Sequence, residues 1–292
     1  MASTRQLKSR IRSVKSTKQI TKAMQMVAAS KMRRTQDAAK SSAPYEAAAQ
    51  DIMTYLAGQG ATDDHPLFRR RPLKSRLIIL VAADKGLAGA YNASVLRTYT
   101  DLLLRDDARG IKNHTITVGR KASHFASRLK DTDILGSYDD MPDHPAGSTF
   151  HAILSTACSM YEQEQIDVVT VVYTQFINSI NQQATMMRLL PAGTELFSDP
   201  GAVPNTIADS KFEPSVPEVL NAVLYRMVGS RLFQALLDSR ASEHSMRMLA
   251  MKNATDNASD LIDDLTLEMN KARQDAITQE ISEISGGVEA MK

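Results

Sequence analysis

A length of 292 residues allows one or two domains, and a formal net charge of +2 conceals a strong charge asymmetry between the two ends. The single cysteine, Cys158, excludes an internal disulfide and a cysteine metal cluster. No stretch approaches the ~20 apolar residues of a membrane span. The start of the chain also lacks the short apolar core of a secretory signal. Its basic, amphipathic start resembles an organelle transit peptide, but motif-like residues begin almost at once, so we expect a mature sequence.

The first predicted element is a long helix over residues 3–57. Residues 1–43 contain neither proline nor glycine and carry eleven lysines and arginines against one acid, Asp37. Pro44 is expected to kink or interrupt the helix, and Gly58 to close it. An apolar stripe at helical spacing begins with Leu7, Ile11 and Val14.

The middle of the chain alternates short strands with helices. The run LIILVAA at 77–83 is typical of a buried strand, and a strand at 167–175 is followed across a polar loop by a return partner at 184–190. Alternating strands and helices imply a mostly parallel sheet, to which the late hairpin adds an antiparallel edge. We therefore predict a Rossmann-like α/β domain at 61–215. Its other expected elements are helix 91–107, strand 115–118, helix 120–130, a weak strand at 133–138 and helix 149–163.

A second long helix is predicted from Glu218 to the end of the chain. At about 1.5 Å per residue it reaches roughly 100 Å, far more than the ~19 Å radius of gyration of a compact domain of this size. This segment is acidic, so we expect it to pair with the basic first helix as an antiparallel coiled coil. The predicted fold is thus α/β plus a long antiparallel coiled coil, divided at 1–60, 61–215 and 216–292.

The charges suggest a register for this coiled coil. If Met24 lies near Arg247, the basic stretch meets the acidic stretch, and the expected charge pairs are Lys8 with Asp263 and Arg12 with Asp260. The end of the second helix then extends past the start of the first. The apolar stripe of this end needs a sleeve supplied by other chains. The stripe consists of Ile277, Ile281, Ile284 and Val288.

Candidate catalytic or binding chemistry is sparse. The six histidines are scattered without metal-ligand spacing, and no Gly-x-Ser-x-Gly elbow is present. Cys158 sits in a helical apolar pattern and is interpreted as a core thiol. The loop 84–90 follows a strand and could cradle phosphate, but it matches neither a P-loop nor Gly-x-Gly-x-x-Gly, and a tight strand–helix turn explains it equally well. We predict no catalytic residue, no cofactor and no metal.

Three segments together resemble one family, the gamma subunits of rotary ATP synthases. They are KQITKAMQMVAASKM at 18–32, ADKGLAGAYN at 83–92, and EHSMRMLAMKNATDNASDLIDDLTLEMNKARQDAITQ at 243–279. The resemblance runs from residue 3 to about 288, and the N-terminal sequence resembles bacterial members of the family more than imported mitochondrial ones. One departure is Ala88-Gly89-Ala90, where many relatives have Cys-Gly-Gly.

This resemblance implies a non-catalytic central shaft of a proton-translocating ATP synthase. The implied partners are the α and β subunits of the catalytic hexamer, the epsilon subunit and the membrane rotor ring, at the cytoplasmic face of the bacterial inner membrane. The resemblance assigns Phe212 and Glu213 to contacts with the membrane rotor ring. The residues that it assigns to contacts with β are Met24, Arg247, Arg273, Gln274, Thr278 and Glu280.

Two other classes of function remain open from the residues alone. The basic first helix could belong to a coiled coil that binds nucleic acid, which predicts an affinity that falls steeply with salt. The α/β unit could belong to a nucleotide-dependent enzyme, which predicts ATP binding by the isolated chain. Neither reading explains the apolar end of the second helix.

Overall fold

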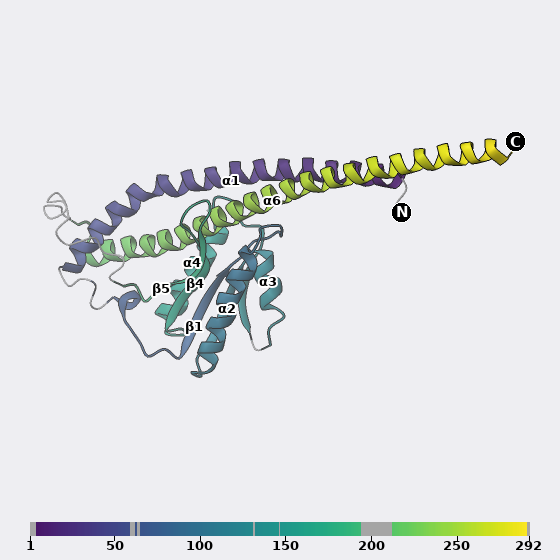
Figure 1. Ribbon diagram of the computed structural model, residues 1–292. Coiled ribbons are helices and arrows are strands. Elements are labelled where there is room, and N and C mark those ends of the chain that lie inside the picture. Colours follow the sequence, from purple (N-terminus) through teal and green to yellow (C-terminus); the bar gives the residue numbers. More distant parts are fainter. Residues whose placement is uncertain are drawn as a thin grey trace. The chain divides into compact units, whose positions relative to one another are not determined.

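The computed structural model describes residues 4–58, 62, 65–130, 132–145, 147–193 and 212–290, without the side chains of 42–43, 45–46 and 286–290. Two units make up the chain, Met1–Ala29 with Arg247–Lys292, and Ser30–Met246. In chain order the elements are α1 (Thr4–Gly58), η1 (Pro66–Phe68), β1 (Ser75–Val81), α2 (Tyr91–Asp107), β2 (Lys112–Val118), α3 (Arg120–Ala126), β3 (Asp133–Tyr138), α4 (Ser148–Glu162), β4 (Val168–Phe176), β5 (Gln182–Leu190) and α6 (Val216–Ala290) (Figure 1).

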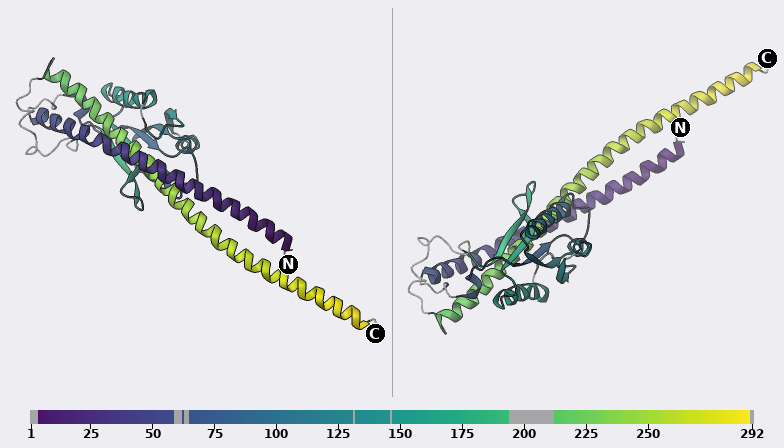
Figure 2. Two further views of the ribbon diagram at one scale, coloured as in Figure 1. Left: turned by 90° about the horizontal axis from the view of Figure 1, so that it is seen from above. Right: turned by 90° about the horizontal axis from the view of Figure 1, so that it is seen from below.

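The first unit is a helical hairpin made of the start of α1 and the end of α6, which run side by side in opposite directions (Figure 2). Leu7 and Ile11 pack against Leu265, and the hydroxyl of Thr255 donates to that of Thr21 at 2.8 Å. The antiparallel pairing is therefore confirmed. At Thr21 the predicted register differs from the observed pairing, because it would set Ala250 rather than Thr255 opposite Thr21.

The two apolar stripes meet in this unit, whereas the residues of the predicted charge pairs lie outside that contact. Lys8, Arg12, Asp260 and Asp263 are all exposed, and in the described part of the chain no ion pair within 4.0 Å joins either base to either acid. Exposed pairs gain little because water already solvates them, whereas apolar side chains lose their contact with water only where the two stripes meet. Longer-range attraction between the two segments stays a prediction.

The long helices form over nearly the predicted ranges. Pro44 lies inside α1, which nevertheless continues to Gly58, so the expected interruption is wrong. Pro44 is exposed, and the turns that follow it are fixed by the core, where Met53 and Leu56 are fully buried. Packing therefore outweighs the backbone hydrogen bond that a proline removes.

The second unit is built around a five-stranded sheet with the order β3-β2-β1-β4-β5. Strands β3, β2, β1 and β4 are parallel, and β5 pairs antiparallel with β4. In the centre, Ile79 of β1 pairs with Ile116 of β2 on one side and with Val171 of β4 on the other. The predicted parallel sheet with an antiparallel edge is confirmed, including the weak strand at 133–138.

Alternate residues of β1 enter two different cores. Ile78 and Leu80 pack with α2 and α3 on one face. Leu77, Ile79 and Val81 belong to the other core, together with buried residues of α4 and of the first part of α6. Cys158 of α4 is buried in this second core, where burial raises the pKa of its thiol to about 12. The thiol is thus a packing residue.

Candidate functional site

A doubly wound sheet binds ligands beyond the carboxyl ends of its strands, at the point where the strand order reverses. In this chain that point lies between β1 and β4. The chain's own helix occupies it: Ser242 of α6 donates to the carbonyl of Thr174 in β4 at 3.3 Å, and the hydroxyls of Tyr91 and Ser239 lie 2.6 Å apart. The place that would hold a diffusible ligand is filled by α6.

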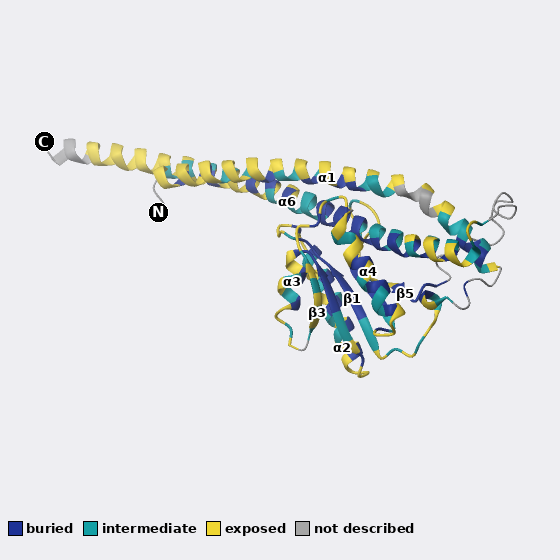
Figure 3. Cartoon of the chain, turned by 180° about the vertical axis from the view of Figure 1, so that it is seen from behind, coloured by how far each residue is buried: buried dark blue, intermediate teal, exposed yellow. Residues whose placement is uncertain are grey.

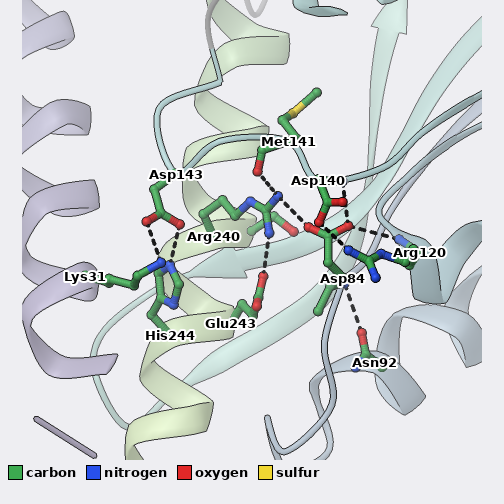
Figure 4. A network of polar contacts seen from close by, with 12 residues as sticks. Lys31, Asp84, Asn92, Arg120, Asp140, Met141, Asp143, Arg240, Glu243 and His244 are labelled. Carbon is green, nitrogen blue, oxygen red and sulfur yellow. Dashed lines mark hydrogen bonds and ion pairs between the residues drawn. The ribbon is translucent and has the colours of Figure 1, made fainter. Parts of the chain in front are cut away.

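A buried polar cluster, which we call the inner clamp, fastens α6 to this edge of the sheet. It consists of Asp84, Met141, Arg240 and Glu243 (Figure 4). The Arg240 guanidinium donates to Asp84 Oδ2 at 3.2 Å, to Glu243 Oε2 at 2.9 Å and to the carbonyl of Met141. Asp84 follows β1, and Met141 belongs to the loop between β3 and α4. One side chain of α6 therefore holds two separate loops.

The charges in the inner clamp stabilise one another. Burial favours the neutral form of Asp84 and is the largest effect on it, yet backbone N–H groups of Asp140 and Arg120 and the charge of Arg240 hold its pKa below the ordinary value. Burial likewise opposes the charge of Arg240, but Glu243 and Asp84 raise its pKa. Both groups are ionised at neutral pH, and each compensates the other's loss of hydration.

A second cluster, the outer clamp, consists of Lys31, Asp143 and His244. The Lys31 ammonium lies 2.9 Å from Asp143 Oδ2, and His244 Nε2 lies 3.0 Å from Oδ1 (Figure 4). Lys31 is on α1, His244 on α6 and Asp143 on the loop between β3 and α4. The loop that Arg240 holds through Met141 is therefore also attached to both long helices.

The glycine loop that could have cradled phosphate serves this attachment. The backbone N–H groups of Arg120 and Asp140 donate to Asp84 Oδ1 at 3.1 and 3.0 Å, so the first residue of the loop joins two neighbouring segments. Gly119 completes the edge with a φ of +93°, and a Cβ there would lie 2.1 Å from the carbonyl oxygen of Ala82. Only glycine fits at that position.

The residues assigned to the β subunit lie in two stretches of the first unit. Met24 and Arg247 are half-buried, whereas the other four are exposed along the end of α6 (Figure 3). The apolar stripe of that end is also exposed, with Ile277, Ile281 and Ile284 at 49%, 62% and 69%. The side chain of Val288 lies outside the described residues. The four exposed contact residues are Arg273, Gln274, Thr278 and Glu280.

The residues assigned to the ring belong to the second unit. Phe212 is half-buried and stacks on Tyr55 with 5.8 Å between ring centroids, and Glu213 is exposed. Most of the segment that precedes them, 194–211, lies outside the described residues.

Sequence reasoning missed the two clamps. The signal was present, because residues 238–245 (DSRASEHS) interrupt the apolar stripe of α6 with polar side chains that turn out to be mostly buried. Such a run inside a long helix points to a polar partner. The partners, Asp84 and Asp143, lie far away in sequence and could not be paired with it by spacing.

The described residues offer little other chemistry. They contain no group of three histidine, cysteine, aspartate or glutamate side chains placed to hold a metal ion. None of the helices in the described part has an apolar stretch of the length and purity that a membrane crossing requires.

The chain thus combines paired terminal helices with an inserted α/β sheet, and one of those helices fills the crevice of the sheet. A sequence model described as ATP synthase matches residues 3–291. ATP synthase gamma chains of Macrococcus caseolyticus and Staphylococcus carnosus are 39% and 38% identical, over the whole of this chain and of each relative. The chain belongs to the ATP synthase gamma-chain family.

Solved structures agree with this assignment. A chain from the central stalk and c-ring of the Tetrahymena thermophila mitochondrial ATP synthase has a TM-score of 0.59 and 27% identity, and covers 80% of this chain and 99% of its own. A chain from the rotor of the Euglena gracilis enzyme has a TM-score of 0.61 at 17% identity, covering 94% and 98%. The second likeness supports the fold alone.

Proposed function

We propose that this chain is the central rotor shaft of a proton-translocating ATP synthase. It carries torque between a membrane rotor ring and a catalytic α/β hexamer and drives the binding changes at the β sites. In this proposal it catalyses nothing itself, and it is held with the epsilon subunit at the cytoplasmic face of the bacterial inner membrane. The parts 1–60 and 216–292 act as the shaft, and 61–215 as the foot. Full-length membership of the gamma-chain family supports this assignment.

The bare end of α6 is the observation that carries the proposal. Leu265, Met269 and Ala272 still pack near Leu7 of α1, but every side chain from 273 to 285 is exposed. A single helix cannot bury an apolar stripe by itself, and each large apolar side chain gains roughly 1.5–3 kcal/mol on burial. An apolar sleeve of α and β subunits would supply that burial.

Polar residues beside this stripe are suited to sensing orientation. Arg273, Gln274, Thr278 and Glu280 would contact β as the shaft turns, together with Met24 and Arg247. Phe212 and Glu213 would contact the ring. Because the β sites differ only in the face of the shaft that they meet, a rotating asymmetric surface shifts their nucleotide affinities in turn. No observation favours the alternative of nucleic-acid binding.

The test is ATP hydrolysis by α and β subunits reconstituted with this chain. The isolated chain should hydrolyse no ATP, and the complex should sustain turnover. Replacing Arg273→Leu and Gln274→Leu together should impair coupled hydrolysis while the chain stays folded and assembled. The matched control is Lys252→Leu with Asn253→Leu, an exposed pair on the same helix.

Two results would contradict the proposal. ATP hydrolysis by the purified chain that survives removal of contaminating α and β would show a catalytic site. Turnover by the α and β subunits that is sustained equally well without the chain would show that the shaft has no part in the mechanism.

A third result concerns the contact residues alone. Normal catalysis by the Arg273 and Gln274 variant at normal assembly would show that these two side chains do not contribute to coupling.

A further inference from the structure

The inner clamp differs from the rest of the packing around α6 in being directional. Apolar side chains such as Leu224, Val228 and Leu232 bury α6 against the sheet, but contacts of this kind change little when surfaces slide. The Arg240 guanidinium has donors in a fixed planar fork, and its bonds depend on angle as well as distance. It therefore resists small displacements that apolar packing tolerates.

The acceptors of Arg240 come from independent parts of the second unit. Asp84 lies in the loop after β1, and its other oxygen accepts from N–H groups at the start of α3 and in the loop after β3. Met141 lies in that same loop, and Glu243 one turn along α6 keeps the guanidinium in place. The side chains of Arg240, Asp84 and Glu243 are only 10%, 10% and 5% exposed. Buried, fully satisfied networks of this kind rigidify the elements that they join.

We infer that Arg240 is a positioning residue that transmits torque from the α/β sheet into α6. This inference rests on the proposed shaft function. Force applied to the sheet reaches Arg240 through Asp84 and Met141, and α6 continues from Arg240 without a break to Ala290. The outer clamp, through Lys31 and His244, attaches the same loop to both helices and adds a second point of support.

The variant that tests the inference is Arg240→Lys. Lysine keeps the buried charge, so Asp84 and Glu243 are not left without a cation, but its single ammonium cannot reach three acceptors in the guanidinium's geometry. The matched control is Arg76→Lys. Arg76 forms an equally buried pair with Asp106 at 2.6 Å and donates to Thr170, but it joins β1 to α2 and β4 and makes no bond to α6.

The first measurement is rigidity, made on the full-length chain by electron resonance between two spin labels. The labels are attached at Arg105→Cys on α2 and Ala222→Cys on α6, both exposed positions of the second unit. Cys158 is buried and its pKa is raised to about 12, so it remains unlabelled. Arg240→Lys should broaden the distance distribution by about twofold, and Arg76→Lys should leave it unchanged. An unchanged width in Arg240→Lys overturns the inference.

The second measurement is coupling in the reconstituted ATP synthase. Without a proton gradient, the enzyme that carries Arg240→Lys should hydrolyse ATP at the normal rate. Against a proton gradient it should pump several-fold fewer protons per ATP, because the load displaces the sheet along α6. A normal pumping ratio, or an equal loss in Arg76→Lys, overturns the inference. These outcomes are distinct from failure of the proposed function, in which the wild-type chain itself sustains no turnover.

Discussion

Removing the Asp84 carboxylate should destabilise the second unit more than any exposed substitution nearby. Asp84→Ala takes one acceptor from Arg240 and leaves the N–H groups of Arg120 and Asp140 without theirs. Deleting one partner of a buried ion pair costs about 3–5 kcal/mol. Because Arg240 keeps Glu243 and the Met141 carbonyl, we expect the lower end, about 3 kcal/mol.

Urea denaturation followed by circular dichroism measures this loss, with Asp139→Ala as the matched control. Asp139 is an exposed aspartate at the same edge of the sheet, so its removal should change the free energy of unfolding by less than about 0.5 kcal/mol. If the two variants unfold at the same urea concentration, the inner clamp contributes no stability and the reasoning is refuted.

The pH dependence gives the same prediction a second check. The pKa of Asp84 is lowered in the folded chain from its ordinary value of 3.8. Its contribution is therefore fully present above that unfolded value and is lost as the pH falls through the lower folded pKa. The difference between wild type and Asp84→Ala should be constant near neutral pH and should shrink below about pH 4. A difference that grows on acidification would contradict the assignment.

Three further predictions follow from the packing. Gly119→Ala should destabilise the chain by about 2–4 kcal/mol through its positive φ and the clash with Ala82, whereas thermal unfolding of Gly86→Ala should match wild type, because a Cβ there meets nothing within 4 Å. Cys158 should resist alkylation at pH 8 in the folded chain and react in urea; rapid reaction in the native state would show that the α4 core opens. Charge reversal in the helical hairpin should lower the free energy of unfolding by ~0.2–1 kcal/mol per pair, and the double reversal should restore part of that loss. No recovery in the double reversal would show that the longer-range attraction is absent. The reversals change Lys8 and Arg12 to Glu, and then Asp260 and Asp263 to Lys.

Sequence patterns predict the elements of this chain well because each reports a local preference. The LIILVAA run predicts β1, and the apolar stripes predict both long helices. These patterns are local because backbone geometry alone decides which residues of a strand or helix share a face. The register of the hairpin could not be predicted in the same way. It depends on how the stripes around Leu7 and Leu265 interlock, while the charges used to predict it are exposed and weak.

The clamps show the same limit for the candidate site. That residues 238–245 are polar is visible in the sequence, but nothing local states that Arg240 meets Asp84, 156 positions away. The proposed contact residues on α6 came from resemblance to a family, and the partners proposed for them belong to other chains. Physical reasoning from one sequence identifies the exposed apolar end, and it cannot identify the orientation of the surfaces that receive it.

The helix that fills the crevice between β1 and β4 acts as a ligand that is tethered to its own binding site. A diffusible ligand dissociates when its dissociation constant rises above its concentration. A tethered group is governed instead by its effective concentration, which is in the millimolar range for a short flexible link. A mutation that weakens one contact of Ser239 or Ser242 a hundredfold would therefore weaken the packing of α6, but α6 would still occupy the crevice. Because the chain itself supplies the group that fills the crevice, attachment of residues 239–242 to the sheet requires no small molecule.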